Sequence, residues 1–220
     1  MHVNIIIPTY NRPVLLMETI HSIKHNSYKD VSIFVVVDGN REILDKILLE
    51  KVAVLFNPER RDWIYSINRG ISYAISDAVM YAADDLVFKK DCLEKAVRAM
   101  EEKFPDGNGL IAINQTVGGI TSAFGLMGRK FIEHFPARRV FCPEFIHYSS
   151  DSEIGLYARN NNLFHYCEDA IMDHKRLKDD TWRKANEIKN KDYETRVLRR
   201  GRGLIWGDSF ELVTEKGVYD

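Results

Sequence analysis

The first hundred positions alternate between strand-like and helix-like segments. Short apolar runs predict strands at residues 3–7, 31–37, 52–56 and 78–82, and the spacing of apolar residues predicts helices at residues 14–24, 41–49, 63–76 and 92–103. Residues 31–37 are almost entirely apolar, as in a strand that helices cover on both faces. We therefore expect an α/β fold with a mostly parallel central sheet flanked by helices.

The second half of the chain is less regular. Strands are predicted at residues 110–114, 122–128 and 163–167, a polar connection at residues 115–119, and helices at residues 150–160 and 181–198. Apolar periodicity weakens near residues 175–179, where charge density rises. We therefore expect one domain over residues 1–176 and a basic helical tail over residues 177–220, packed on the domain or extending from it.

Polar residues follow three of the predicted strands. Residues 9–12 come after the first strand, Asp38 after the second, and the adjacent Asp84 and Asp85 after the fourth. Ligands of open parallel sheets bind at the carboxyl ends of the strands, so we expect these residues to meet in one crevice. Two buried acids require a cation or polar ligand to compensate them, although such a pair, taken alone, also suits a turn and helix cap.

The chemistry of this crevice points to a metal ion. The first strand is followed by Pro8, Thr9 and Tyr10 instead of a glycine-rich phosphate loop, and Gly118-Gly119 lacks the lysine and serine of a Walker motif. A metal would therefore have to neutralise any bound phosphates. Asp84 and Asp85 offer the hard oxygen ligands that Mg²⁺ and Mn²⁺ prefer.

Composition narrows the class of protein. The 220 residues are 45% hydrophobic and 29% charged, which is enough to bury a sizeable core, and the net charge of −1 creates no global attraction to nucleic acid or anionic membrane. The three cysteines, Cys92, Cys142 and Cys167, suit reduced thiols better than a disulfide framework. No signal peptide and no apolar run near ~20 residues is present, so we expect a soluble, cytoplasmic protein.

The tail has a local excess of positive charge. Residues 183–202 contain eight Lys or Arg against three Asp or Glu, and Trp182 and Trp206 flank this segment. Such a run suits a solvated helix face. Alternatively, it closes over a diphosphate or holds an anionic acceptor, and the tryptophans suit stacking on sugars or bases.

Five motifs then occur in the order of a known family. They are Ile-Ile-Ile-Pro-Thr-Tyr-Asn-Arg-Pro (5–13), Val-Val-Val-Asp-Gly-Asn (35–40), Ile-Asn-Arg-Gly-Ile (67–71), Ala-Asp-Asp (83–85), and Ser-Asp-Ser-Glu (150–153) with a later His174. Together, over roughly residues 3–176, they resemble the inverting glycosyltransferases of family 2, which have the GT-A fold. The resemblance implies transfer of a sugar from a nucleoside diphosphate sugar, UDP-linked, to an acceptor hydroxyl of a glycan, a small molecule or a modified nucleobase.

The same resemblance implies a set of donor-binding residues, namely Pro8, Thr9, Tyr10, Arg12, Asp38, Arg61, Asn68 and Asp84. In this assignment Thr9 and Tyr10 line the nucleobase. Asp38 accepts the imino N–H of uracil or thymine, unless it is a strand-to-helix N-cap. Arg61 approaches the base or diphosphate, or is solvated with Arg60, whereas Asn68 contacts the donor or only supports the crevice.

The metal, Mn²⁺ or Mg²⁺, is implied to bind Asp85. The first acid of the family's Asp-x-Asp motif is replaced by Ala83, so Asp84 is left to bind the ribose or a metal-bound water. His174 matches a family histidine that reaches the metal or the diphosphate, or it is a packing residue.

The catalytic and acceptor side follows from the same motifs. Asp151 is implied to be the general base that deprotonates the acceptor, with an N-cap as the alternative role. Glu153 is assigned to an acceptor or sugar hydroxyl, or to stabilisation of the helix dipole. Gly125 lies in the acceptor-side segment, where small residues let a sugar approach the backbone.

Two other classes of protein remain open at this point. A nucleotidyltransferase has a related sheet, but we would expect a glycine-rich N-terminal loop with a basic residue, which residues 8–13 do not provide. A nucleic-acid-binding protein would use the basic tail, and salt-dependent DNA binding without sugar transfer would favour it. A combination of both ideas is a glycosyltransferase that acts on a modified DNA base.

Overall fold

The N-terminal half of the chain forms the parallel part of a central sheet. The computed structural model describes residues 1–116 and 119–207, and it contains all four strands predicted in this half: β1 (Val3–Thr9), β2 (Val31–Asp38), β3 (Ala53–Asn57) and β4 (Ala78–Tyr81). β1 lies between β2 and β4 and β3 lies outside β2, with all three pairings parallel. Every residue of β1 is buried, as expected for a strand covered on both faces.

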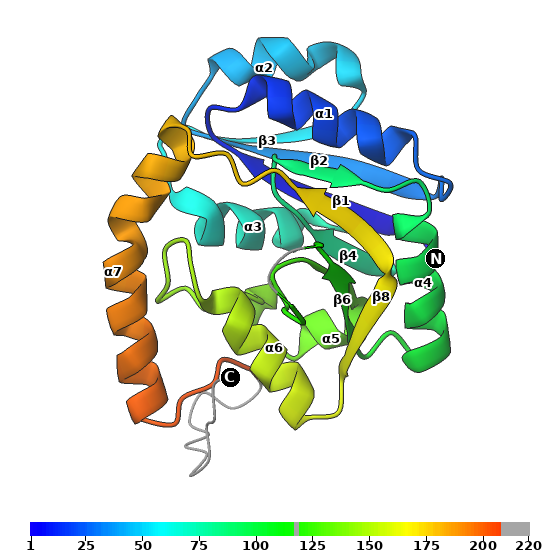
Figure 1. The fold of residues 1–220 in the computed structure, drawn as a ribbon, viewed down its shortest axis with the longest axis vertical. Coiled ribbons are helices and arrows are strands. Elements are labelled where there is room, and N and C mark those ends of the chain that lie inside the picture. The colour runs from blue at the N-terminus through cyan, green and yellow to red at the C-terminus, as the bar shows by residue number, and fades with distance from the viewer. Residues whose placement is uncertain (117–118, 208–220) are drawn as a thin grey trace.

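Helices cover the two faces of this sheet (Figure 1). α1 (Pro13–Lys24), α2 (Glu42–Ile47) and α4 (Cys92–Lys103) contribute to one apolar cluster, and an exposed 3₁₀ turn (Leu48–Glu50) follows α2. α3 (Asp62–Tyr73), α5 (Arg129–Glu133) and α6 (Ser150–Asn160) contribute to the other.

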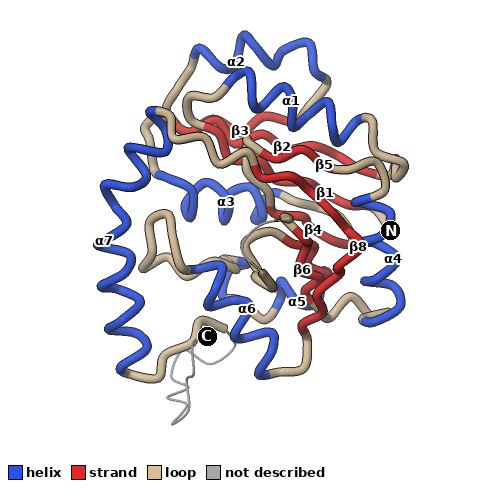
Figure 2. Tube along the Cα trace, in the orientation of Figure 1, coloured by secondary structure: helices blue, strands red, loops and turns tan. Residues whose placement is uncertain are grey.

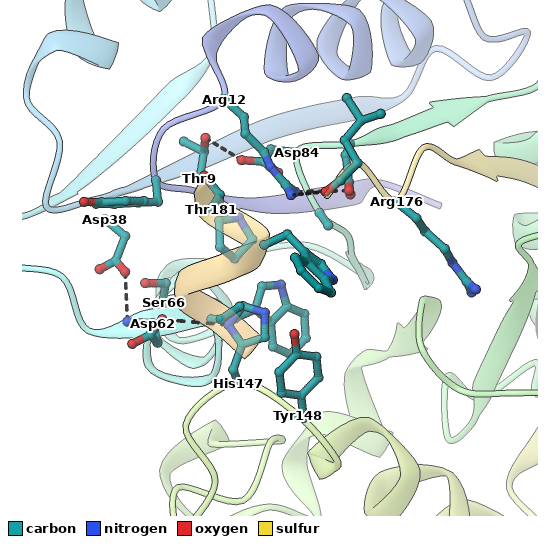
Figure 3. A pocket seen from close by; sticks show the side chains of 18 of the residues that line it. Thr9, Arg12, Asp38, Asp62, Ser66, Asp84, His147, Tyr148, Arg176 and Thr181 are labelled. Atoms are coloured by element: carbon teal, nitrogen blue, oxygen red, sulfur yellow. Dashed lines mark hydrogen bonds and ion pairs between the residues drawn. The ribbon is translucent and has the colours of Figure 1, made fainter. Parts of the chain in front are cut away.

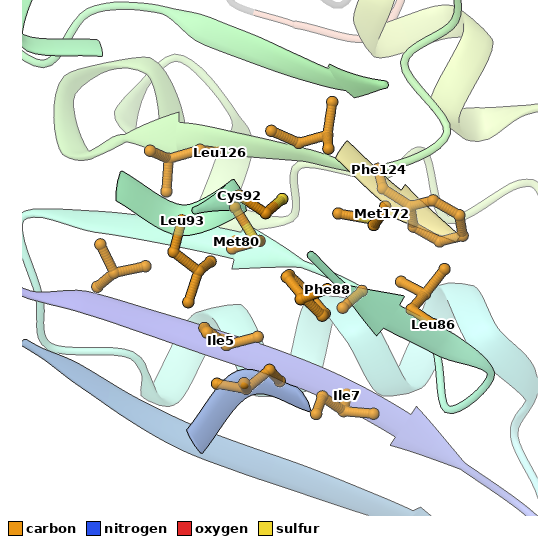
Figure 4. Close-up of a cluster of buried hydrophobic side chains, with 14 of the residues drawn as sticks. Ile5, Ile7, Met80, Leu86, Phe88, Cys92, Leu93, Phe124, Leu126 and Met172 are labelled. Atoms are coloured by element: carbon orange, nitrogen blue, oxygen red, sulfur yellow. The ribbon is translucent and has the colours of Figure 1, made fainter. Parts of the chain in front are cut away.

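The two clusters are separated by the alternation of side chains along the strands. Ile5 and Ile7 belong to the cluster with Leu93 and Phe88 that Figure 4 shows, whereas Ile6 belongs to the opposite cluster. The continuous apolar run of β1 therefore supplies both cores.

The C-terminal half extends the sheet (Figure 2), and its strand pairing is mixed. Its strands are β5 (Leu86–Phe88), β6 (Leu110–Asn114), β7 (Gly125–Gly128) and β8 (Phe164–His174), and the full order is β3-β2-β1-β4-β7-β6-β8-β5. β7 is antiparallel to β4 and β6, and β5 is antiparallel to β8, whereas β6 and β8 are parallel. Among the described residues, four of the seven strand pairings are thus parallel. Three of these four lie in the N-terminal half, where the sheet is entirely parallel as predicted.

The C-terminal strands are also where the predicted boundaries are wrong. β7 begins at Gly125 instead of residue 122, because the Ser122 carbonyl accepts a hydrogen bond from the Tyr81 hydroxyl instead of one from a neighbouring strand. β8 runs to His174 instead of ending at 167, because an irregularity opposite Ile113 and Asn114 interrupts its apolar pattern. β5 was missed, since three residues are too few to show a period. Residues 117–118 of the predicted polar connection lie outside the described residues.

The long polar helix of the tail is α7 (Asp180–Gly201), which begins just after the predicted boundary at residues 175–179. Asp179 is its N-cap and accepts a hydrogen bond from the Trp182 amide at 2.9 Å. The helix runs along one side of the molecule, at the left of Figure 1, and only Ala185, Asp192 and Arg199 are buried on it. Residues 208–220 of the predicted tail lie outside the described residues. No helix in the described part of the chain is long and apolar enough to cross a membrane.

Candidate functional site

The predicted crevice is present as a cavity of about 350 Å³ at the strand ends (Figure 3). Eight of the predicted site residues line it, namely Pro8, Thr9, Tyr10, Arg12, Asp38, Asp84, Asp85 and His174. They come from the ends of β1, β2 and β8 and from the segment after β4. The sheet therefore brings together residues that are up to 166 positions apart, as the rule for carboxyl strand ends predicts.

The acid pair is compensated by a cation of the protein itself. Arg12 Nη1 lies 3.0 Å from Asp85 Oδ2 and 3.3 Å from Asp84 Oδ1. Asp84 Oδ2 also accepts a hydrogen bond from the Thr9 hydroxyl at 2.8 Å, and His174 Nε2 lies 3.3 Å from Asp85 Oδ1. The requirement that two buried acids find partners is thus met by Arg12, Thr9 and His174.

These partners give the two acids opposite ionisation behaviour. Burial, with the adjacent Asp85 charge, raises the pKa of Asp84 to about 6 although Arg12 and Thr9 oppose the shift. Burial also disfavours ionisation of Asp85, but the hydrogen bond and charge of His174 and the charge of Arg12 outweigh it and lower the pKa of Asp85. Asp85 is therefore the more readily ionised of the pair.

Arg12 also connects the acids to the tail helix. Its Nε and Nη2 donate to the two carboxylate oxygens of Asp179, at 2.8 Å and 2.9 Å. Asp179 is the N-cap of α7, so one guanidinium joins the loop after β1, the segment after β4 and the start of α7. The tail helix thereby becomes a wall of the cavity, to which Thr181, Trp182 and Ala185 contribute.

Asp38 holds the start of α3. Its Oδ1 accepts from the Asn57 side chain at 2.8 Å and from the Arg61 amide at 2.9 Å, and its Oδ2 accepts from the Asp62 amide at 2.8 Å. The alternative that Asp38 caps the next helix along the chain is wrong, because the residue before α2 is Arg41. Burial raises the pKa of Asp38, although these three hydrogen bonds oppose the shift.

Of the two adjacent arginines, Arg60 lines the cavity, whereas Arg61, which was predicted to approach the base or diphosphate, does not. The Arg60 guanidinium lies 4.6 Å from the centre of the Tyr10 ring and donates to Asp62 Oδ1 at 2.6 Å, within the cavity wall. The Arg61 guanidinium instead lies 4.3 Å from the Tyr65 ring centre and does not line the cavity. The segment after β3 thus contributes to the site, as the segments after β1 and β2 do. The rule for carboxyl strand ends applies to β3 as well, although only the ends of β1, β2 and β4 were predicted to meet.

Two other predicted residues support the fold around the cavity instead of lining it. The Asn68 side chain donates to the Phe141 carbonyl at 2.7 Å and accepts from the Phe141 amide at 3.0 Å. Gly125 lies inside β7, where a Cβ would approach the Ile111 carbonyl oxygen to 2.7 Å. Of their predicted roles, only the supporting role of Asn68 matches this arrangement.

Asp151 lies in the first turn of α6 and is not among the residues that line the cavity. The Ser122 hydroxyl donates to the Asp151 carbonyl oxygen at 2.6 Å, and the next residue, Ala123, lines the cavity. The N-cap of α6 is Ser149, so the alternative that Asp151 itself is the cap is wrong. Burial raises the pKa of Asp151, which moves this carboxylate toward the range of a general base.

Glu153 is occupied by the tail helix. Its side chain is only 1% exposed, its Oε1 lies 2.5 Å from Arg199 Nη2, and its Oε2 accepts from Arg199 Nε at 3.0 Å. The Trp206 amide donates to Oε1 as well, at 2.6 Å. This arrangement does not match the prediction that Glu153 binds an acceptor hydroxyl, because both oxygens are buried and bonded.

His147 and Tyr148 line the cavity although no sequence signal pointed to them. They lie in the irregular segment before α6, across the cavity from Arg12 and Asp84 (Figure 3). Gln115 and Arg176 also line the cavity, and each has a side-chain atom 3.2 Å from His174 Nδ1. Irregular segments have no periodicity from which to infer such placements.

The fit of the predicted metal is partial. Within residues 1–116 and 119–207, no three His, Cys, Asp or Glu side chains are arranged to hold a metal ion. Asp85 Oδ1 and His174 Nε2, 3.3 Å apart, form a pair that can share one cation, and other ligands would have to come from a bound substrate. Mn²⁺ suits a carboxylate with an imidazole better than Mg²⁺, which favours oxygen ligands alone.

Two relatives match about half of the chain. The chain is 29% identical over 124 residues to a glucosyl-dolichyl phosphate glucuronosyltransferase of Haloferax volcanii, an alignment that covers 53% of this chain and 38% of the relative. It is 26% identical over 110 residues to the glycosyltransferase GlyG of Streptococcus pneumoniae, covering 47% and 36%. The chain thus spans little more than a third of the length of these relatives.

Solved structures match almost the whole chain. A mannosyltransferase from Pyrobaculum calidifontis, in complex with GDP-Man and Mn²⁺, superposes with a TM-score of 0.68 at 16% identity and covers 90% of this chain and 64% of that one. TarS of S. aureus superposes with a TM-score of 0.63 at 15% identity, covering 91% and 42%. At such identities the likeness concerns the fold, and it agrees with the GT-A architecture that the motifs implied.

The family model for glycosyl transferase family 2 matches residues 4–126, which include β1 to β6 and the Asp84–Asp85 pair. This match covers more than half of the chain. The protein therefore belongs to glycosyl transferase family 2.

Proposed function

We propose that the protein is an inverting, metal-assisted glycosyltransferase that moves a sugar from a nucleoside diphosphate sugar, UDP-linked, to an acceptor hydroxyl. The observation that supports this most is the meeting of Asp38, the Asp84–Asp85 pair and His174 in one cavity. Donor binding needs two parts. One is a carboxylate that can hydrogen-bond a nucleobase, and the other is a carboxylate–imidazole pair that can bind a cation.

In this proposal the base lies near Tyr10 and Asp38. Asp38 Oδ2 accepts a hydrogen bond from the Asp62 amide, and a carboxylate oxygen can accept a second one, such as that of the imino N–H of uracil. Guanine also has a ring N–H donor, and the P. calidifontis neighbour contains GDP-Man whereas another structure of S. aureus TarS contains UDP-GlcNAc. A donor test should therefore include both nucleotides.

The diphosphate would lie against the acid pair. Asp85 and His174 would hold Mn²⁺, whose charge supplies stabilisation of the leaving diphosphate. Arg12 Nη1 contacts both acids in the present state, so we expect it to move from them toward the diphosphate oxygens when the donor binds.

Asp151 is our candidate for the general base. Its raised pKa suits a group that receives the acceptor's proton, and its backbone carbonyl accepts from the Ser122 hydroxyl, one residue before the cavity-lining Ala123. We expect Asp151→Asn to keep donor affinity and melting temperature and to lower transfer by roughly 10²–10⁴-fold. Asp45→Asn, an exposed acid on α2, is the control, and near-normal transfer by the Asp151 variant would exclude this role.

The overall proposal is tested by a donor screen that needs no known acceptor. UDP-sugars and GDP-sugars are incubated with the protein in Mn²⁺ or in chelator, and release of nucleoside diphosphate is measured. We expect slow, Mn²⁺-dependent hydrolysis of a UDP-sugar. Hydrolysis of GDP-sugars alone would correct the donor, and salt-dependent DNA binding without turnover of any donor would favour the nucleic-acid alternative.

A further inference from the structure

The tail helix makes its most buried polar contact with the backbone of residues 146–148. The Asp192 side chain on α7 has no exposed surface, and its Oδ1 accepts from the Ile146 amide at 2.8 Å. Its Oδ2 accepts from the amides of His147 and Tyr148, at 2.8 Å and 2.7 Å. Three consecutive amides thus converge on one carboxylate.

The hydrogen bonds of Asp192 are strong because its negative charge lies where three N–H dipoles point. Successive backbone N–H groups that point inward make a concave site for an anion, and a carboxylate that accepts several of them is held more firmly than a neutral acceptor. An amide side chain cannot replace it, because an Asn has one acceptor oxygen and would place its NH₂ against N–H donors. Asp192 therefore specifies the conformation of this segment by its charge and both oxygens.

Residues 146–148 are irregular backbone that follows the buried Phe145. Residues 142–149 contain no helix or strand, and Ser149 has a positive φ of 72°. The Ile146 carbonyl accepts from the Ile64 amide, at the start of α3, at 3.1 Å. The segment is thus held between α3 on one side and Asp192 of α7 on the other.

The residues so held face the donor cavity. His147 and Tyr148 line it opposite Arg12 and Asp84, as Figure 3 shows. His147 Nδ1 is buried and faces Asp62 Oδ1 at 3.8 Å, whereas 26% of the His147 side-chain surface is exposed. Because His147 lines the cavity, the exposed part of its ring is available to a ligand there.

We propose that Asp192 is a positioning residue that holds His147 and Tyr148 as the far wall of the cavity, and that the exposed part of the His147 side chain contacts the nucleotide sugar. The proposal rests on the proposed function for the identity of the ligand. It assigns to α7 an indirect part in donor binding, because Asp192 acts only by positioning residues 146–148.

The first test needs no ligand. Hydrogen exchange of the amides of residues 146–148 is compared in the unmodified protein, in Asp192→Asn and in Glu194→Gln, an exposed acid on the same helix. We expect at least ~10-fold faster exchange of these amides in Asp192→Asn alone, with the β1 and β4 amides unchanged. Unchanged exchange in a folded Asp192→Asn overturns the proposal, whatever the protein binds.

The second test uses donor kinetics with the sugar nucleotide that the screen identifies. Asp192→Asn and His147→Gln are each expected to raise KM about tenfold and to leave kcat within about threefold, and the double variant should be no worse than either single variant. His147→Gln should show normal exchange, so it remains informative if Asp192→Asn folds poorly. A normal KM for His147→Gln overturns the contact to the donor.

The two proposals fail in different ways. Absence of binding of UDP or GDP, with Mn²⁺, by the unmodified protein overturns the proposed function and the donor contact of His147. In that case, faster exchange of the amides of residues 146–148 in Asp192→Asn would still show that Asp192 positions this segment. Normal exchange would overturn the positioning role of Asp192 as well.

Discussion

At the residue scale, Asp84 and Asp85 are neighbours in sequence with different electrostatic surroundings. Asp85 is paired with both Arg12 and His174, whereas Asp84 has Arg12 at a longer distance and the neutral Thr9 hydroxyl. Burial acts on both, so the difference in pKa direction follows from the partners. The two carboxylates can therefore have separate roles, with Asp85 the ionised ligand and Asp84 a group that titrates closer to neutrality.

We predict that Asp85→Asn abolishes Mn²⁺-dependent nucleotide binding. The substitution removes the charged ligand at a place where the diphosphate brings negative charge of its own. Calorimetry of UDP and GDP binding with Mn²⁺ and with chelator measures the effect, and Asp45→Asn is the control for a lost exposed acid. Unchanged Mn²⁺-dependent affinity would mean that the metal site lies elsewhere.

We predict that Asp84→Asn changes the pH dependence of stability in the metal-free protein. The folded-state pKa of Asp84 is raised to about 6, so its protonated form stabilises the fold at low pH, and this contribution is lost as the pH rises from about 4 to 6. Relative to the unmodified protein, the variant should gain up to about 3 kcal/mol between pH 4 and 7.

Urea unfolding at several pH values, in chelator, checks this prediction. Asp85→Asn is a control of opposite sign, because a lowered folded-state pKa contributes stability above the unfolded pKa that disappears as the pH falls. Parallel pH profiles for both variants would contradict the difference in environment that we assign to the two acids.

At the element scale, α7 is attached to the domain by polar contacts. Its buried positions, Ala185, Asp192 and Arg199, recur every seven residues and so form one stripe along the helix, but two of the three are charged. Asp192 binds the amides of residues 146–148, and Arg199 binds Glu153. A polar stripe of this kind is hard to distinguish, in sequence, from a solvated helix.

We predict that Arg199→Ala destabilises the protein by about 3–5 kcal/mol, because it leaves the buried Glu153 carboxylate without its cation. Lys189→Ala, on an exposed position of the same helix, should change the unfolding free energy little. Urea unfolding measures both. Adding Glu153→Gln to Arg199→Ala should recover part of the loss, and no recovery would argue against an unpaired charge as the cause.

At the scale of the whole molecule, the cavity is closed by parts of the chain from both ends. Because its walls come from β1, α3, β8 and α7, ligand binding should stabilise the entire fold and not one element.

We predict that UDP and Mn²⁺ together raise the melting temperature more than either alone. A ligand at about a hundred times its Kd stabilises the folded state by about 2.7 kcal/mol, which corresponds to about 5–10 °C for a chain of this size. Thermal unfolding followed by fluorescence measures the shift, and Asp85→Asn should remove the extra effect of the pair. Additive shifts, as from separate sites, would contradict the shared site.

The sequence by itself determined the N-terminal half of the fold and the core of the site. Continuous apolar runs such as residues 31–37 predicted buried parallel strands, and the ends of those strands placed Thr9, Asp38 and the Asp84–Asp85 pair together. These inferences succeeded because periodicity and the carboxyl-end rule are properties of local sequence and of sheet geometry.

Only the tertiary structure decided what completes the cavity. The extent of β8, the placement of His147 and Tyr148, and the attachment of Glu153 to Arg199 depend on contacts between segments tens of residues apart. None of these features produces a periodic pattern in the sequence. From the sequence alone, Glu153 is compatible both with binding an acceptor and with a buried ion pair, and only its neighbour Arg199 distinguishes the two roles. The physical reason is that a polar side chain takes its role from the group that satisfies it, and long-range packing selects that group.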